Sequence, residues 1–247
     1  MNGQKEVKQI ALIKTGCTID GIKPGFGDFE DWFAEGLGVT NLLQIDVFRQ
    51  QALPDPDTLA GIVVTGSPAM VSARHDWSER TAAWLRQAVR TNIPVLGVCY
   101  GHQLLAHALG GVAGPNPSGR QIGTVKSQLA ESIDNDPLLC DLPLSFRAQT
   151  SHSEVVLALP PGAIRLATSP LDGNFAIRFT ENTWGVQFHP EFSAPVMSDY
   201  IRYRSSALLE EGLNPQELLS EVTETKEAKS VLKKFTGLVQ RKSDFDT

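Results

Sequence analysis

The stretch that decides the fold is PVLGVCYGHQLLAHALGG, residues 94–111. It begins with an apolar run typical of a buried strand and continues as a helix-like run that closes on Gly-Gly. A strand that leads directly into a helix is the repeating step of α/β folds. Cys99 lies at the turn between the two runs, with a glycine two positions away on either side. The turn therefore combines a fold signal with a thiol that may serve chemistry or merely packing.

The residues before this stretch alternate in the same way. The patterns predict strands over 8–16, 42–48, 61–67 and 94–98, and helices over 27–38 and 76–92. Continuously apolar strands separated by helices indicate a mostly parallel sheet that is covered by helices on both faces. Sites in such sheets lie beyond the carboxyl ends of the strands, which is where Cys99 is found.

The second half of the chain has a different pattern. From Gly123 to about residue 188, short β-like segments are separated by turn residues, which predicts an antiparallel β extension of the same domain. The tail is helical by composition, and Asn214 with Pro215 marks a helix start. No repeat or Gly/Ser linker interrupts the chain. We therefore expect a single domain over residues 1–247, with a core at about 8–194 and C-terminal helices at about 195–240.

Composition excludes several classes of protein. With 41% hydrophobic residues, 20% charged residues and a net charge of −6, the chain is globular and has no basic footprint for nucleic acid. The N-terminal residues lack a signal-peptide pattern, and no apolar run approaches a membrane span. Three cysteines without close spacing favour a reducing cytoplasm, with no structural disulfide and no metal site.

Residues 97–101, GVCYG, have the form of a nucleophile elbow, a strained strand-to-helix turn that exposes a nucleophile. Glycine suits both flanking positions, because a β-carbon there would collide with the neighbouring strand or helix. The turn also places the sulfur at a helix N-terminus, which stabilises a thiolate. The alternative is that Cys99 is a small core residue before an ordinary turn.

A nucleophilic cysteine needs a base, and the base needs an orienting partner. His189 in NTWGVQFHPEF is the best candidate, followed by Pro190 and Glu191. Pro190 favours an extended conformation, in which residues two apart project to the same side, so we expect Glu191 to accept from one imidazole nitrogen while the other faces the thiol. Without these neighbours, packing would explain His189 equally well. The other histidines are weaker candidates: His75, His102, His107 and His152.

Together these two motifs resemble the class I glutamine amidotransferases, whose Cys-His-Glu triad uses a G-x-C-x-G-x-Q elbow and a later H-P-E. The resemblance runs from about residue 8 to 192 and is similar in wording to the amidotransferase domain of GMP synthase, with a relation to γ-glutamyl peptidases. It implies a flavodoxin-like α/β fold. It also implies that Cys99 attacks the glutamine side-chain amide, that His189 transfers protons and that Glu191 orients it.

The same resemblance implies an oxyanion hole of two backbone donors. One is Tyr100, and the other is Gly66 or Ser67 in the loop after the third strand. Many family members have Gly-Gly-Pro where this chain has Gly-Ser-Pro, so which residue donates and how freely the loop flips stay open.

Substrate contacts are also implied by the family. Gln103 matches the glutamine that holds the amino acid end of the substrate, although on its own it would be a helix-start residue. The segment after Thr150 resembles the family's S-H-G-D, with serine for glycine and glutamate for aspartate, and a plain β turn is the alternative. The implied contacts in this segment are Ser151, His152, Ser153 and Glu154.

Three functions follow as hypotheses. The sequence has no nucleotide-binding synthetase motif, so the first is a glutaminase that passes ammonia from L-glutamine to a separate synthase subunit. The second is a free-standing hydrolase of γ-glutamyl peptides or conjugates, which needs only a different leaving-group pocket. The third is a non-catalytic regulatory protein on this fold. None requires an organic cofactor, a metal, nucleic acid or a membrane, and the oligomeric state is not predicted.

Overall fold

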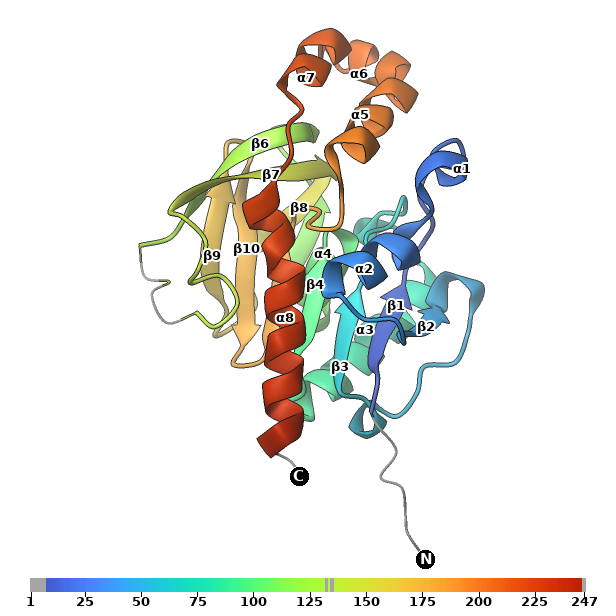
Figure 1. Ribbon diagram of the computed structural model, residues 1–247, viewed down its shortest axis with the longest axis vertical. Helices are drawn as coiled ribbons and strands as arrows, with labels where there is room; N and C mark the ends of the chain where they lie inside the picture. The colour runs from blue at the N-terminus through green and yellow to red at the C-terminus, as the bar shows by residue number, and fades with distance from the viewer. Residues whose placement is uncertain (1–7, 132, 134–135, 246–247) are drawn as a thin grey trace, which may run out of the picture.

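A sheet of nine strands forms the centre of the molecule, in the order β2-β1-β3-β4-β11-β10-β9-β6-β7 (Figure 1). The computed structural model describes residues 8–131, 133 and 136–245. The strands of this sheet are β1 (Ile10–Lys14), β2 (Leu43–Asp46), β3 (Gly61–Val64), β4 (Val95–Val98), β6 (Gln121–Leu129), β7 (Ser145–His152), β9 (Ile164–Ser169), β10 (Asp172–Thr180) and β11 (Thr183–Val186). A small second sheet pairs β5 (Val112–Pro115) with β8 (Glu154–Ala158).

Helices cover both faces of the large sheet. The helices are α1 (Lys23–Phe26), α2 (Phe29–Leu37), α3 (Asp76–Arg90), α4 (Tyr100–Ala108), α5 (Ala194–Tyr203), α6 (Ser205–Glu210), α7 (Pro215–Glu221) and α8 (Lys226–Phe245), with short 3-10 turns η1 (Val47–Arg49), η2 (Pro56–Thr58) and η3 (Val71–Ala73). Alternate strand residues enter two apolar cores: Leu12 joins the core with α2 and α8, and Ile13 joins the core with α3 and α4. Figure 1 shows α8 and α2 in front of the sheet.

The predicted fold class is confirmed. β1 pairs parallel with β2 and β3, and β3 pairs parallel with β4, whereas β6, β7, β9 and β10 pair antiparallel. The last strand departs from the expectation of a purely antiparallel second half. β11 is antiparallel to β10 but parallel to β4, with Gly185 opposite Gly97. It therefore ends at the same edge of the sheet as β4, and the chains that follow both strands meet there.

Several local elements follow from the sequence signals. Asp28 caps α2 in a capping box with Asp31, and Gly38 ends the helix in the left-handed conformation at φ 67°. Asn214 caps α7 as predicted, its side chain accepting from the Gln216 N–H. The pattern did not reveal α1 or β5, because both are short.

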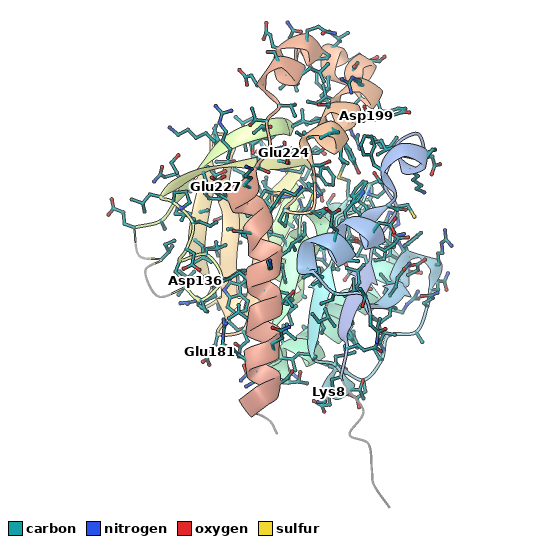
Figure 2. The ribbon with its side chains drawn as sticks, in the orientation of Figure 1. Lys8, Asp136, Glu181, Asp199, Glu224 and Glu227 are labelled. Atoms are coloured by element: carbon teal, nitrogen blue, oxygen red, sulfur yellow. The ribbon has the colours of Figure 1, made fainter. Side chains whose placement is uncertain are left out.

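The tail is tied to the sheet at two levels. α8 buries Val231, Leu232, Phe235 and Val239 against the core. The connection before it is held by hydrogen bonds, since the Ala194 N–H donates to Glu224 Oε1 at 2.9 Å (Figure 2). The continuous helix suggested by residues 214–239 is interrupted between α7 and α8. Within the described residues, no helix is both long enough and apolar enough to cross a membrane.

Candidate active site

Cys99 lies at the end of β4 in a strained backbone conformation, with φ 51° and ψ −101°. Non-glycine residues rarely adopt a positive φ, and such conformations persist only where the surroundings impose them. Here the Cys99 N–H donates to the Val186 carbonyl at 2.8 Å, and its carbonyl accepts from the Gln103 N–H at 3.1 Å. The turn between β4 and α4 is therefore fixed from the neighbouring strand and from the helix.

The two flanking glycines are required by close contacts. A β-carbon on Gly97 would lie 2.4 Å from the Gly101 carbonyl oxygen, and one on Gly101 would lie 2.4 Å from the Val64 carbonyl oxygen. Both neighbours are backbone atoms, which cannot move aside as a flexible side chain could. The first contact is with α4 and the second with β3, so the elbow depends on close packing of the helix between the strands.

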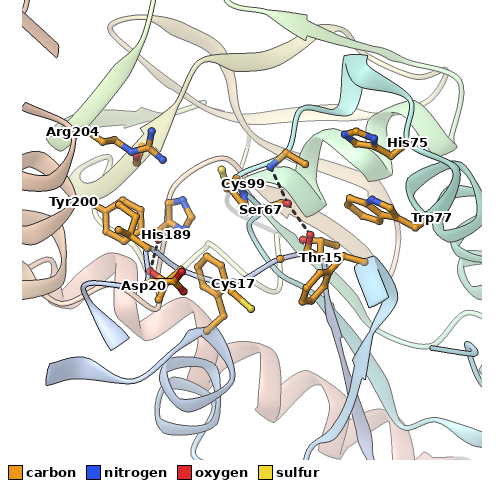
Figure 3. A pocket seen from close by; sticks show the side chains of 18 residues that line it. Thr15, Cys17, Asp20, Ser67, His75, Trp77, Cys99, His189, Tyr200 and Arg204 are labelled. Carbon is orange, nitrogen blue, oxygen red and sulfur yellow. Dashed lines mark hydrogen bonds between the residues drawn. The ribbon is translucent and has the colours of Figure 1, made fainter. Parts of the chain in front are cut away.

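His189 follows β11 and reaches the same edge of the sheet as Cys99. Its N–H donates to the Gln149 carbonyl at 2.8 Å, and its ring stacks on Phe192 with centroids 4.1 Å apart. The imidazole is 4% exposed and hydrogen-bonds to Cys99. The parallel pairing of β11 with β4 is what brings these two side chains together (Figure 3).

Glu191 meets His189 through a turn rather than an extended segment. The Phe192 N–H donates to the His189 carbonyl at 3.3 Å, which closes a turn with Pro190 in the second position, a position that proline favours. The expected extended conformation was thus wrong, but the expected contact is present. His189 Nδ1 lies 2.6 Å from Glu191 Oε1, and the glutamate side chain is fully buried.

The electrostatics of this pair favour a charged imidazole. Burial opposes the protonated form, but the negative charges of Glu191 and Cys99 and the hydrogen bonds to both outweigh it and raise the pKa of His189 to about 10. At neutral pH, His189 therefore holds a proton that it can give to a leaving nitrogen.

The loop after β3 lies against both residues. A β-carbon on Gly66 would be 2.9 Å from His189 Cε1 and 3.7 Å from Cys99 Cβ. Two hydroxyls hold the Gly66 carbonyl, Thr15 Oγ1 at 2.8 Å and Thr65 Oγ1 at 2.9 Å. The Ser67 hydroxyl donates to the Thr15 carbonyl at 2.7 Å. These bonds tether the loop to the end of β1.

Backbone donors remain available beside the sulfur. Among the described residues, no hydrogen bond uses the N–H of Tyr100, Gly66 or Ser67. Buried or partly buried N–H groups normally have partners, so unused ones at a site are candidates for ligand binding. The arrangement can accommodate an oxyanion between α4 and the loop after β3.

A cavity of about 520 Å³ opens over Cys99 and His189. Figure 3 shows Cys99 and Ser67 in its middle, His75 and Trp77 on one side, and Tyr200 and Arg204 on the other. The lining also includes the segment that follows β1, namely Thr15, Gly16, Cys17, Thr18, Ile19 and Asp20.

The residues predicted to contact substrate separate into two groups. Ser151 lines the cavity, whereas the other four do not. Gln103 Nε2 donates to the Glu154 carbonyl at 2.7 Å and to Gln187 Oε1 at 3.0 Å. Glu154 Oε2 accepts from the Val71 N–H at 2.8 Å, so this carboxylate supports η3. The substrate role of these residues stays a prediction.

His152 and Ser153 also lie away from the cavity lining. His152 is buried, and its Nδ1 lies 3.0 Å from the Glu154 carbonyl oxygen. Burial lowers the pKa of His152 to about 4, which keeps it neutral. The Ser153 carbonyl accepts from the Asn116 N–H at 2.8 Å, so this residue helps to join the two halves of the small β region.

The cavity contains residues that the sequence did not mark. Trp77 was expected only as an apolar helix position, yet it lines the cavity and stacks on Tyr100 with centroids 5.6 Å apart. Arg204 lies at the end of α5, far along the chain from both motifs. No local pattern distinguishes it from the other tail arginines. Within the described residues, no group of His, Cys, Asp and Glu side chains is arranged to hold a metal ion.

Known proteins share this sequence and architecture. A family model described as "Glutamine amidotransferase class-I" matches residues 22–203. The chain belongs to the class I glutamine amidotransferase family. Class I membership agrees with the fold and with the two motifs around Cys99 and His189.

Two relatives and one solved structure illustrate the similarity. The chain is 39% identical over 142 residues to a glutamine-hydrolyzing GMP synthase of Aeropyrum pernix, a match that covers 57% of this chain and 25% of that enzyme. It is 26% identical over 207 residues to gamma-glutamyl peptidase 3 of Arabidopsis thaliana, covering 80% of this chain and 82% of that protein. A glutamine amidotransferase of Thermotoga maritima superposes with a TM-score of 0.71 at 22% identity, covering 95% and 98% of the two chains.

Proposed function

We propose that the protein hydrolyses the side-chain amide of glutamine through a thioester on Cys99. The observation that carries this proposal is the strained cysteine at the elbow, hydrogen-bonded to a histidine that is itself bonded to a buried glutamate. In this constellation Cys99 is the nucleophile, His189 the acid and base, and Glu191 the orienting group. The oxyanion donors are the N–H of Tyr100 and that of Gly66 or Ser67.

The reaction has two stages. In the first, the Cys99 sulfur bonds to the amide carbon, the C–N bond breaks, and His189 gives its proton to the nitrogen that leaves as ammonia. In the second, water loses a proton to His189 and attacks the thioester carbon, the C–S bond breaks, and glutamate leaves. Oxyanion stabilisation by the two backbone donors applies to both tetrahedral intermediates.

The test is glutamate release from L-glutamine by the purified protein, measured for wild type and Cys99→Ala. We expect release by wild type alone, and also when a candidate ammonia-accepting synthase is added. The similarity to part of a GMP synthase supports such a separate partner, because the rest of that enzyme has no counterpart in these residues. No release in either setting would overturn the proposal.

A γ-glutamyl amide with a larger leaving group is the second candidate. Two observations favour it: the cavity of about 520 Å³ extends past the sulfur to Trp77 on one side and Arg204 on the other, and the similarity to gamma-glutamyl peptidase 3 covers most of both chains. The same triad would act, and an amine would leave in place of ammonia. Comparing kcat/KM for glutamine and γ-glutamylglycine decides between them, and inertness toward the peptide removes this candidate.

A non-catalytic role is the remaining hypothesis. A diazoketone analogue of glutamine should alkylate Cys99 in the wild-type protein. Failure of the wild type to react, together with no hydrolysis of any γ-glutamyl compound, would favour a regulatory protein.

A further inference from the structure

The charged residues of the cavity differ in how they are paired. Of the described residues that line it, Asp20 and Arg204 are the acid and the strong base, beside the imidazoles and thiols. Asp20 Oδ1 lies 2.8 Å from Lys23 Nζ, and His189 is paired with Glu191. Arg204 makes no ion pair with any described residue. The cavity therefore contains an uncompensated positive charge.

The position of Arg204 makes this charge costly. The residue lies where α5 passes into α6, its side chain is only partly exposed, and its Nε is buried without a hydrogen-bond acceptor in the described part of the chain. Burial and the nearby Arg120 charge lower the pKa of Arg204. A guanidinium nevertheless stays protonated in proteins, so the charge persists. Unpaired buried charges are strongly unfavourable unless a ligand compensates them.

The nearest acidic alternative is already engaged. Glu211 Oε2 lies 2.7 Å from Arg120 Nε, and Glu211 Oε1 lies 2.9 Å from Arg120 Nη2. This two-bond geometry uses both carboxylate oxygens and is the preferred arrangement for arginine. Arg120 and Arg204 thus provide an internal comparison, one arginine with a carboxylate and one that lacks it.

Arg204 also faces the reacting atoms. Figure 3 shows its guanidinium on the same side of Cys99 as His189 and Tyr200, across the cavity from Trp77. A guanidinium fork matches a carboxylate and is poorly matched to a neutral amide. Glutamine and γ-glutamyl peptides carry carboxylates, whereas the reacting amide itself is neutral.

We propose that Arg204 binds a carboxylate of the substrate and so sets the substrate class to anionic γ-glutamyl compounds. This inference rests on the proposed hydrolysis at Cys99. The carboxylate has two possible sources, the α-carboxylate of the glutamyl part or a carboxylate on the amine that leaves. Both use the same chemistry at Arg204, and a set of matched substrates distinguishes them.

The kinetic test compares wild type, Arg204→Gln and Arg202→Gln on three γ-glutamyl substrates. γ-Glutamylglycine carries both carboxylates, γ-glutamylethylamide lacks the one on the amine, and the α-amide of γ-glutamylglycine lacks the one on the glutamyl part. Arg202 is the matched control, because it lies on the same helix, is exposed and pairs with Asp199 outside the cavity. Loss of a charge-assisted pair should lower kcat/KM about ten- to hundredfold.

The pattern of losses identifies the source. If Arg204→Gln loses activity on γ-glutamylglycine and γ-glutamylethylamide but not on the α-amide, Arg204 binds the glutamyl carboxylate. If the loss is confined to the two substrates that carry the glycine carboxylate, Arg204 binds the leaving part. Equal losses on all three substrates, or no loss beyond that of Arg202→Gln, would overturn the proposal.

A binding measurement separates this inference from the proposed reaction. In the Cys99→Ala background no turnover occurs, and calorimetry reports the affinity for γ-glutamylglycine directly. We expect Arg204→Gln to weaken that affinity at least tenfold, Arg204→Lys to restore part of it, and Arg202→Gln to leave it unchanged. An affinity that is indifferent to residue 204 contradicts the proposal even if wild type hydrolyses glutamine. Binding that depends on Arg204 in a protein without turnover would contradict the hydrolysis instead.

Discussion

Two corners of one cavity are built in opposite ways. In the catalytic corner, formed by Cys99, His189 and Glu191, the backbone of the cysteine is bonded on both sides and the imidazole is bonded to a buried carboxylate. In the arginine corner, formed by Arg204 and Tyr200, a guanidinium lines the cavity without an acidic partner. The first corner is complete without substrate, and the second corner lacks a counter-charge. The difference indicates that chemistry is preorganised here and that recognition is completed by the ligand.

The largest effect should come from breaking the catalytic corner at its buried end. Glu191→Gln keeps the size of the side chain but removes the charge that orients and stabilises the imidazolium. Such a change costs about 10²- to 10⁴-fold in kcat. Steady-state hydrolysis of glutamine measures this loss, with Glu217→Gln on the exposed helix α7 as control. A loss of less than threefold would remove Glu191 from the triad.

The elbow itself should respond strongly to an added methyl group. Gly97→Ala places a β-carbon 2.4 Å from the Gly101 carbonyl oxygen, and we expect a loss of about 2–4 kcal/mol in the free energy of unfolding. Gly173→Ala is the matched control, because nothing lies within 4 Å of a β-carbon there. Urea unfolding of both variants measures the difference. Equal stability of the two variants would mean that the helix is not held against the strand as described.

The ion pair in the catalytic corner predicts a pH dependence of stability. His189 has a pKa of about 10 in the folded protein against an ordinary value of 6.5, so the protonated form is bound more tightly by the fold. Its contribution is complete below pH 6.5 and is lost as the pH rises through 10. The stability advantage of wild type over Glu191→Gln should therefore shrink between pH 6.5 and 10. An advantage that grows over this range would reverse the sign of the assignment.

The smallest expected effect concerns the loop between the two corners. Ser67→Ala removes the hydrogen bond to the Thr15 carbonyl that tethers the loop after β3. A net loss of about 1 kcal/mol in loop positioning corresponds to about a fivefold decrease in kcat, with KM little changed. Ser220→Ala is the control, since its hydroxyl bonds a carbonyl within the exposed helix α7. An unchanged kcat would show that the tether does not position the oxyanion donors.

The same contrast explains what the sequence could predict. The catalytic corner is written in short motifs, because Gly97, Cys99 and Gly101 are two residues apart and His189 is two residues from Glu191. The alternation of apolar strands and helices placed the first motif at the edge of a parallel sheet. The parallel pairing of β11 was not predictable, because its antiparallel hairpin with β10 dominates the local pattern.

The arginine corner could not be predicted, for a physical reason. Arg204 reaches the cavity only because α5 and α6 pack over the end of the sheet, and its significance depends on carboxylates being used elsewhere. Trp77 was assigned to the core side of a helix, since periodicity does not separate a residue that covers a core from one that lines a cavity. The turn that joins His189 to Glu191 was also missed, because proline suits both an extended segment and the second position of a turn.

The most direct test of the account is where a glutamine-like electrophile attaches. Wild type is treated with a diazoketone analogue of glutamine, digested, and analysed by peptide mass spectrometry, with Cys99→Ala and Glu191→Gln alongside. The account predicts a single adduct on residues 94–111 at Cys99, slower labelling of Glu191→Gln, and none in Cys99→Ala. Labelling of Cys17 or Cys140 in place of Cys99, or equal labelling in the presence and absence of excess glutamine, would contradict it.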